Sequence, residues 1–186
     1  MEDLIALAVG KKLALDQLRP LSGGALARLD HYYDIEITYA SNAVEGNTLT
    51  AVETTLVIEK GITIAAKPLR DHMEALDHYD AILYIRSLVS ESAPVTESAV
   101  RDLHRITMHR SQPEHAGSYA NLARYVRTEA DRHEFPSLAE IPASMGDFAA
   151  RLRASQATPG SAFEAHLRWQ VFIRSTMAMG APRACS

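Results

Sequence analysis

Histidine side chains often bind metal ions, and the sequence contains eight of them. Two pairs lie close along the chain: His72 and His78 are six residues apart, and His104 and His109 are five apart. Two rings lie on one face of a helix when they are four residues apart, so neither pair is spaced to share a metal ion. We therefore interpret these histidines as structural or surface residues and expect no metal site.

Other common catalytic patterns are also missing from the sequence. The glycine pair at residues 22–24 is interpreted as an ordinary loop and not as a phosphate-binding loop, and no Ser-His-Asp arrangement is recognisable. The net charge of -4 and the pI near 6.0 argue against a general nucleic-acid binder, because phosphate binding favours a basic surface. No apolar run approaches the roughly 18 residues that suggest a membrane span.

Composition indicates one soluble domain, or one domain with a small appendage. The chain has 186 residues, of which 47% are hydrophobic and 23% are charged, so it can bury a sizeable core. The first residues lack a basic segment followed by a continuous apolar stretch, and we expect no signal peptide. The single cysteine, Cys185, excludes an internal disulfide, and we expect a cytoplasmic location.

Helical signals dominate, so we predict a mainly α fold. Thr50 and Glu53 have the spacing of a capping box, in which the two side chains satisfy free backbone amides at a helix start. This helix should end at Gly61, and Pro68 suits the first turn of a helix that continues to about residue 90. Further helix starts are expected at Thr96 and at two more capping boxes, Ser137–Glu140 and Ser161–Glu164.

One region departs from the helical pattern. Residues 124–127 and 132–135 have the character of two short strands, and the polar residues 128–131 could form the turn between them. We predict a single exposed β-hairpin on the helical body.

The segment SNAVEGNTLT at residues 41–50 resembles the inhibitory segment of Fic-family proteins. The family pattern is serine or threonine, three residues, glutamate, and then glycine or asparagine. The resemblance implies regulatory roles for Ser41, Glu45 and Gly46. The alternative is a plain helix that ends at Gly46, with Ser41 and Glu45 on its solvated face.

Later stretches support the same resemblance, which covers roughly residues 30–170. Residues 103–105 and 113–119 resemble the helix and loop that precede the Fic flap, and residues 163–169 resemble the helix that leads into the catalytic motif. The predicted hairpin falls where the family has its target-docking flap. The residues to which the resemblance assigns this docking role are Arg124, Tyr125, Val126, Arg127, His133 and Phe135. We divide the chain into an amino-terminal helical region with the inhibitory segment (1–90), a partial Fic core (91–170) and a tail (171–186).

The family's catalytic motif, H-P-F-x-D-G-N-G-R, does not occur in these 186 residues. In the family, its histidine acts as general base on the target hydroxyl and its acidic residue holds Mg²⁺ on the ATP phosphates. Its glycines let backbone amides hold those phosphates, and its last arginine adds positive charge. Catalytic residues are therefore expected to be lost, and binding of ATP and Mg²⁺ by this chain is in question.

The genetic code suggests that the motif is encoded in another reading frame. When each codon's last base is read with the first two bases of the next codon, Met177–Ala178 and Met179–Gly180 must both encode glycine. The neighbouring codons permit the remaining motif residues, so residues 172–181 can spell H-P-F-x-D-G-N-G-R-T in the shifted frame. We infer a frameshift near residues 170–171, which would make 171–186 an out-of-frame tail and truncate the domain before its last helices.

The expected fold is a mainly α, Fic-like helical bundle with one β-hairpin, truncated at its carboxyl end. The resemblance implies an ancestral protein adenylyltransferase that moves AMP from ATP to a hydroxyl of a target protein, restrained by Glu45; this chain is expected to be inactive. Two alternatives stay open, namely a non-enzymatic binding or dimerisation module and the remnant of a damaged gene. A target protein or a second copy of the chain is the expected partner, and a membrane or nucleic acid is not.

Overall fold

The computed structural model describes residues 2–18, 23–121, 125–127, 132–134, 137–155 and 158–176. This part of the chain is mainly helical, as the sequence predicts. The α-helices are α1 (Glu2–Asp16), α2 (Gly23–Val44), α3 (Ala51–Lys60), α4 (Leu69–Ser90), α5 (Glu97–Ile106), α6 (Ile141–Ala154) and α7 (Pro159–Thr176), and a short 3-10 helix, η1 (Leu138–Glu140), leads into α6. Within the described residues, no helix is both long enough and apolar enough to cross a bilayer.

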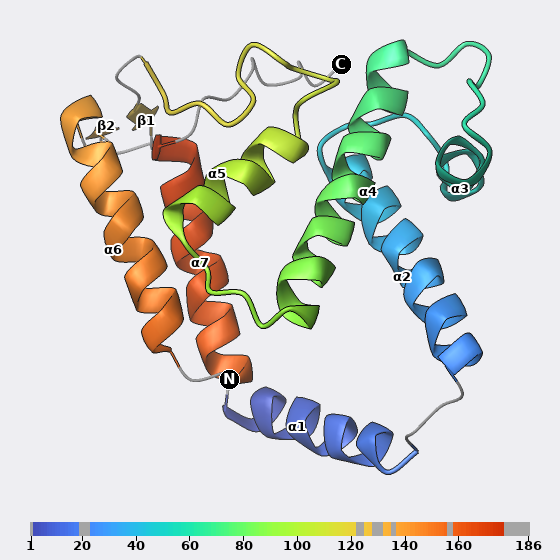
Figure 1. Cartoon of the computed structure of the whole chain (residues 1–186), viewed down its shortest axis with the longest axis horizontal. Helices are drawn as coiled ribbons and strands as arrows, with labels where there is room; N and C mark the ends of the chain where they lie inside the picture. Colours follow the sequence, from blue (N-terminus) through green and yellow to red (C-terminus); the bar gives the residue numbers. More distant parts are fainter. Residues whose placement is uncertain are drawn as a thin grey trace.

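Helices α2, α3 and α4 form one side of the molecule, and α5, α6 and α7 form the other (Figure 1). Helices α4 and α5 are in contact and join the two sides, while α1 lies against α7. The hydrophobic core of the first side is built from Leu49, Val57 and Ala75, with Ile64 and Leu76 packed around them. Burying each of the larger side chains contributes about 1.5–3 kcal/mol to the free energy of unfolding.

Polar contacts also join α2 to α4. The buried carboxylate of Asp34 accepts hydrogen bonds from Nε and Nη2 of Arg86 at 2.9 and 2.7 Å. These bonds raise the pKa of the Arg86 guanidinium above its ordinary value. One turn further along α2, the hydroxyl of the fully buried Thr38 lies 3.3 Å from Nδ1 of His78. The two contacts fix the rotation of α2 against α4, and therefore the direction in which the end of α2 points.

Acid should weaken the packing of α2 on α4. Burial lowers the pKa of His78 below its ordinary value of 6.5, because the charged imidazolium is poorly solvated between the helices. As the pH falls through 6.5, the unfolded chain takes up a proton that the folded chain does not yet bind, so the free energy of unfolding should decrease. Urea unfolding at several values between about pH 6.5 and 5.5 measures this. Over that range the free energy of unfolding should decrease less steeply for the variant His78→Gln than for the natural chain. Parallel curves would contradict this role of His78.

Two predicted helix starts are confirmed. At α3, the backbone N–H of Glu53 donates to Thr50 Oγ1 at 3.3 Å, and the Thr50 N–H donates to Glu53 Oε2 at 2.8 Å. The same helix ends at Gly61, which has a left-handed φ of 62°. At α5, Thr96 is the N-cap and its hydroxyl accepts from a backbone N–H of the first turn. Pro68 is the N-cap of α4, one position before the first turn that the sequence predicts for it.

The capping box at Ser137 is also present, but it begins the 3-10 helix η1 before α6. The box predicted at Ser161 is wrong by three residues. The helix starts at Pro159, and Thr158 Oγ1 accepts from the Ser161 N–H at 3.1 Å while Ser161 Oγ accepts from the Thr158 N–H at 3.1 Å. Proline is favoured at the first helical position, which selects Thr158 over Ser161 as the capping residue.

Strands β1 (Tyr125–Arg127) and β2 (Arg132–Glu134) pair antiparallel within the two predicted strand regions. In this register Val126 is opposite His133. Arg124, Phe135 and the predicted turn at 128–131 lie outside the described residues.

Helix α7 continues to Thr176 and so enters the segment that the sequence assigns to an out-of-frame tail. The family motif would place a loop here. The residues present at 170–176 include neither glycine nor proline, and they extend the helix instead. Residues 177–186 lie outside the described part of the chain.

Candidate regulatory site

The end of α2 has a specific geometry that places Glu45. The N–H of Asn47 donates to the carbonyl of Asn42 at 2.9 Å, and the N–H of Gly46 donates to the carbonyl of Ala43 at 3.1 Å. This pair of bonds is the Schellman motif, in which the residue after the helix cap takes a left-handed conformation. Gly46 is that residue, with a φ of 86°. Glu45 is therefore the C-cap residue of α2, directly after the last helical residue and immediately before the left-handed turn.

This geometry explains the residue types of the motif. A left-handed φ is readily adopted by glycine and, less readily, by asparagine, which are the two residues that the family pattern allows after the glutamate. Ser41 lies one turn before Glu45 on the same face of α2, and its carbonyl accepts from the Glu45 N–H at 3.4 Å. Helix α2 ends at Val44, two residues before the helix end at Gly46 that the alternative predicts, and the regulatory roles of Ser41, Glu45 and Gly46 stay predictions.

The carboxylate of Glu45 is exposed, and within the described residues no hydrogen bond or ion pair reaches it. It also stands at the carboxyl end of α2, where the helix dipole is negative, and no basic residue occupies the last turn. A glutamate is unfavourable in this position on electrostatic grounds. The local fold therefore gives no stability reason for a glutamate here, while the position suits a side chain that meets a cation from elsewhere.

The residues that follow the turn are held firmly. Asn47 is almost buried, and its Oδ1 accepts from the Leu49 N–H at 3.0 Å, which shapes the short extended segment before α3. Lys67 reaches back to this segment, where its Nζ donates to the Thr48 carbonyl and lies 3.4 Å from Glu53 Oε2. The hydrogen bond from the Thr50 backbone is the main cause that lowers the pKa of the Glu53 carboxyl, and Lys67 adds to it. Sequence patterns identified Thr50 and Glu53 but missed Lys67.

The loop that leads towards the hairpin is fixed to α5. The N–H of Gly117 donates to Nδ1 of the buried His104 at 3.0 Å, and the Gly117 carbonyl accepts from Arg101 Nε at 3.2 Å. The Arg101 guanidinium lies 5.1 Å from the ring centroid of Tyr119, a cation–π distance. The Tyr119 hydroxyl donates to Glu97, and burial together with this bond raises the pKa of Tyr119.

Replacing Gly117 with alanine should destabilise the protein by about 1–3 kcal/mol. Gly117 has a left-handed φ of 69°, and an added Cβ would lie 3.0 Å from Arg105 Cβ and 3.3 Å from the Arg101 carbonyl oxygen. Gly146 is the matched control, because it lies inside α6 and an added Cβ would meet no atom within 4 Å. Gly146→Ala should stabilise by up to about 1 kcal/mol, since alanine favours a helix. Urea unfolding measures the change in free energy of unfolding for both variants. Equal changes would contradict the tight packing at Gly117.

A buried carboxylate on α4 holds the turn after α5. Asp77 of α4 is fully buried, and its Oδ2 accepts from the backbone N–H groups of Arg110 and Ser111 at 3.1 and 2.9 Å. The Arg110 side chain adds a bond of 3.0 Å to Oδ1, and His109 Nδ1 lies 3.1 Å from the same atom. Asp77 thus ties α4 to the segment that precedes the predicted flap. The side chains of the predicted flap residues lie outside the described part of the chain.

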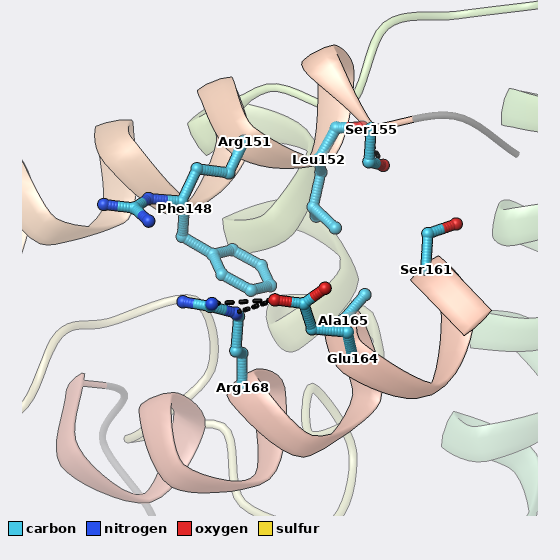
Figure 2. Close-up of a pocket in the computed structure, with 8 residues that line it drawn as sticks. All are labelled: Phe148, Arg151, Leu152, Ser155, Ser161, Glu164, Ala165 and Arg168. Atoms are coloured by element: carbon cyan, nitrogen blue, oxygen red, sulfur yellow. Dashed lines mark hydrogen bonds and ion pairs between the residues drawn. The ribbon is translucent and has the colours of Figure 1, made fainter. Parts of the chain in front are cut away.

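One pocket lies between α6 and α7 and is shown in Figure 2. Its volume of about 180 Å³ is below the roughly 300–1,000 Å³ of typical ligand sites. Glu164 and Arg168 pair across one wall at 2.7 Å, with Phe148 above them. None of the predicted site residues lines this pocket. Among the described residues, no group of three His, Cys, Asp or Glu side chains is placed to hold a metal ion.

Comparison with known proteins gives consistent relatives. No family model matches the chain. The chain is 32% identical over 89 residues to protein adenylyltransferase Fic of Nematostella vectensis, an alignment of 47% of this chain and 21% of that protein. It is 26% identical over 147 residues to protein adenylyltransferase Fic of Culex quinquefasciatus, an alignment of 78% of this chain and 28% of that protein. The chain therefore matches only a minor part of these curated relatives.

Solved structures agree with the sequence relatives. A Fic domain-containing signalling protein from Bacteroides thetaiotaomicron is 29% identical with a TM-score of 0.65, over 73% of this chain and 51% of that one. A variant of C. elegans Fic-1 has a TM-score of 0.77 at 20% identity, over 96% of this chain and 52% of that one. The chain spans about half of each solved relative. The sequence relatives and the solved structures agree, and both are similar to this chain as Fic-domain proteins.

Proposed function

We propose that this chain is the restraint-bearing and target-docking part of a Fic-type AMP transferase. In this proposal, residues 41–46 restrain the transfer of AMP from ATP to a protein hydroxyl, and the hairpin at 124–135 docks the target protein. The observation that carries the proposal is the Schellman turn, because it presents Glu45 as an exposed carboxylate at a fixed point after α2. The adenylyltransferase relatives support the reaction class.

Glu45 suits the restraint for an electrostatic reason. An unpaired carboxylate at the negative end of a helix gains most from pairing with a cation. In the family that cation is the last arginine of the catalytic motif, which would otherwise hold the ATP γ-phosphate. Pairing removes this positive charge from the phosphate and places a like charge beside it.

We further propose that the chain does not catalyse AMP transfer in its present form. The motif that supplies the base, the acidic residue and the phosphate-binding glycines is not among these residues. In the family a single acidic residue of that motif holds Mg²⁺ on the ATP phosphates, so loss of the motif also removes the metal ligand of the reaction. ATP and Mg²⁺ therefore belong to the family reaction and not to the described part of this chain.

The coding DNA tests this proposal directly. We expect a single-base shift near codons 170–171 and, in the shifted frame, an H-P-F-x-D-G-N-G-R motif followed by further Fic-like sequence. A DNA sequence in which no frame encodes the motif would refute the proposed origin of residues 171–186. The chain would then be better explained as a non-enzymatic binding module.

A further inference from the structure

Asp71 is a buried carboxylate in the first turn of α4, with 1% of its surface exposed. A buried charge is costly unless donors surround it, and the amino-terminal end of a helix adds favourable positive potential. Asp71 Oδ2 accepts hydrogen bonds from the Thr48 backbone N–H at 2.7 Å and from the Thr48 hydroxyl at 2.6 Å. Both donors belong to the extended segment that follows the Glu45 turn.

Asn47 strengthens the same connection. Its side-chain amide donates to the Asp71 carbonyl at 2.9 Å and to Glu74 Oε2 at 3.2 Å. The first turns of α4 therefore hold two consecutive residues, Asn47 and Thr48, through backbone and side-chain atoms. These two residues come directly after Gly46.

We propose that Asp71 is a positioning residue for the restraint, because it clamps residues 47 and 48 to α4 and thereby fixes where Glu45 stands. Helix ends fray readily, and glycine at the turn gives this end extra freedom. A contact with the buried side chain of Asp71 on α4, just beyond the turn, removes that freedom. The inference rests on the proposed role of Glu45, but the clamp is a property of this chain and can be measured without ATP.

Asp77 offers a matched control on the same helix. Like Asp71, it is a buried carboxylate that accepts hydrogen bonds from backbone N–H groups, but its donors belong to Arg110 and Ser111 after α5. Asp71→Asn and Asp77→Asn make the same chemical change at two places. Each replaces a charged acceptor with a weaker neutral one of the same shape.

Amide hydrogen exchange of the full chain tests the clamp. Asp71→Asn should speed exchange about tenfold at the backbone N–H groups of residues 46–48 and leave those of residues 110–111 unchanged. Asp77→Asn should show the reverse pattern. If Asp71→Asn instead speeds exchange equally throughout α2, α3 and α4, or changes nothing at residues 46–48, the clamp is refuted.

Thr48→Val tests the same point if Asp71→Asn fails to fold. This substitution removes the hydrogen bond from the Thr48 hydroxyl to Asp71 but keeps the bond from the Thr48 backbone N–H. We therefore expect a smaller increase in amide exchange at residues 46–48 than Asp71→Asn causes. Thr55→Val is its control, because that hydroxyl bonds only the Ala51 carbonyl within α3. Equal exchange profiles for the two threonine variants would overturn the proposal. A failure of Glu45 to affect AMP transfer would refute the proposed function and leave this exchange result intact.

Discussion

The 186-residue chain should transfer no detectable AMP from ATP to itself or to any added protein. Transfer from a nucleotide depends almost entirely on positioning and on electrostatic stabilisation of the phosphates. The loss of a general base alone costs about 10²–10⁴-fold, and the loss of one stabilising donor costs about 10²–10³-fold. With the base, the metal ligand and the phosphate-binding glycines all missing from the sequence, the remaining rate should fall below detection.

Incubation with labelled ATP and Mg²⁺ measures this, with label counted after denaturation to remove bound nucleotide. A protein in which the shifted frame at residues 170–181 is restored serves as the positive control for the same assay. Label that stays on the natural chain after denaturation would show that its own residues catalyse the transfer.

Local signals explain how much of the fold could be predicted. The helix starts at Thr50 and Thr96 depend on side chains and backbone amides within a single turn, and both are present as expected. The predicted start of α7 is wrong because two overlapping boxes compete, and the proline at position 159 favours Thr158 over Ser161. Which capping box forms depends on the backbone geometry of a single helical turn, and residue spacing alone does not predict that geometry.

The clamps could not be predicted from the sequence. Asp71 bonds a residue 23 positions away, and Asp77 bonds backbone groups 33 and 34 positions away. In the sequence both look like acidic residues on the solvated face of a helix, whereas in the fold both are buried. By contrast, the turn at Gly46 could be predicted, because a glycine after a helical run is a local signal for the left-handed end.

In a protein whose reading frame is restored, Glu45→Gly should raise the rate of AMP transfer. The reason is that the carboxylate would no longer pair with the restored arginine or repel the γ-phosphate. A charge-assisted hydrogen bond of about 1.5–3 kcal/mol corresponds to about a 10–160-fold change in rate. Glu45→Gln separates charge from size, and a gain close to that of Glu45→Gly would assign the restraint to charge.

Stability should not account for this gain. The carboxylate of Glu45 is exposed at the negative end of α2 and has no partner among the described residues, so removing its charge should leave the free energy of unfolding nearly unchanged. Glu91 is the matched control, since it is an exposed glutamate at the C-cap of α4. Glu91→Gly makes the same substitution at an equivalent helix position, away from the proposed site.

The most direct test of the restraint is the rate of self-modification by the frame-restored protein, compared with its Glu45→Gly and Glu91→Gly variants under the same ATP and Mg²⁺. The account predicts that Glu45→Gly labels at least about tenfold faster, while Glu91→Gly labels at the unmodified rate. Equal rates for all three proteins would show that Glu45 is an ordinary residue at a helix end and that segment 41–46 does not regulate AMP transfer.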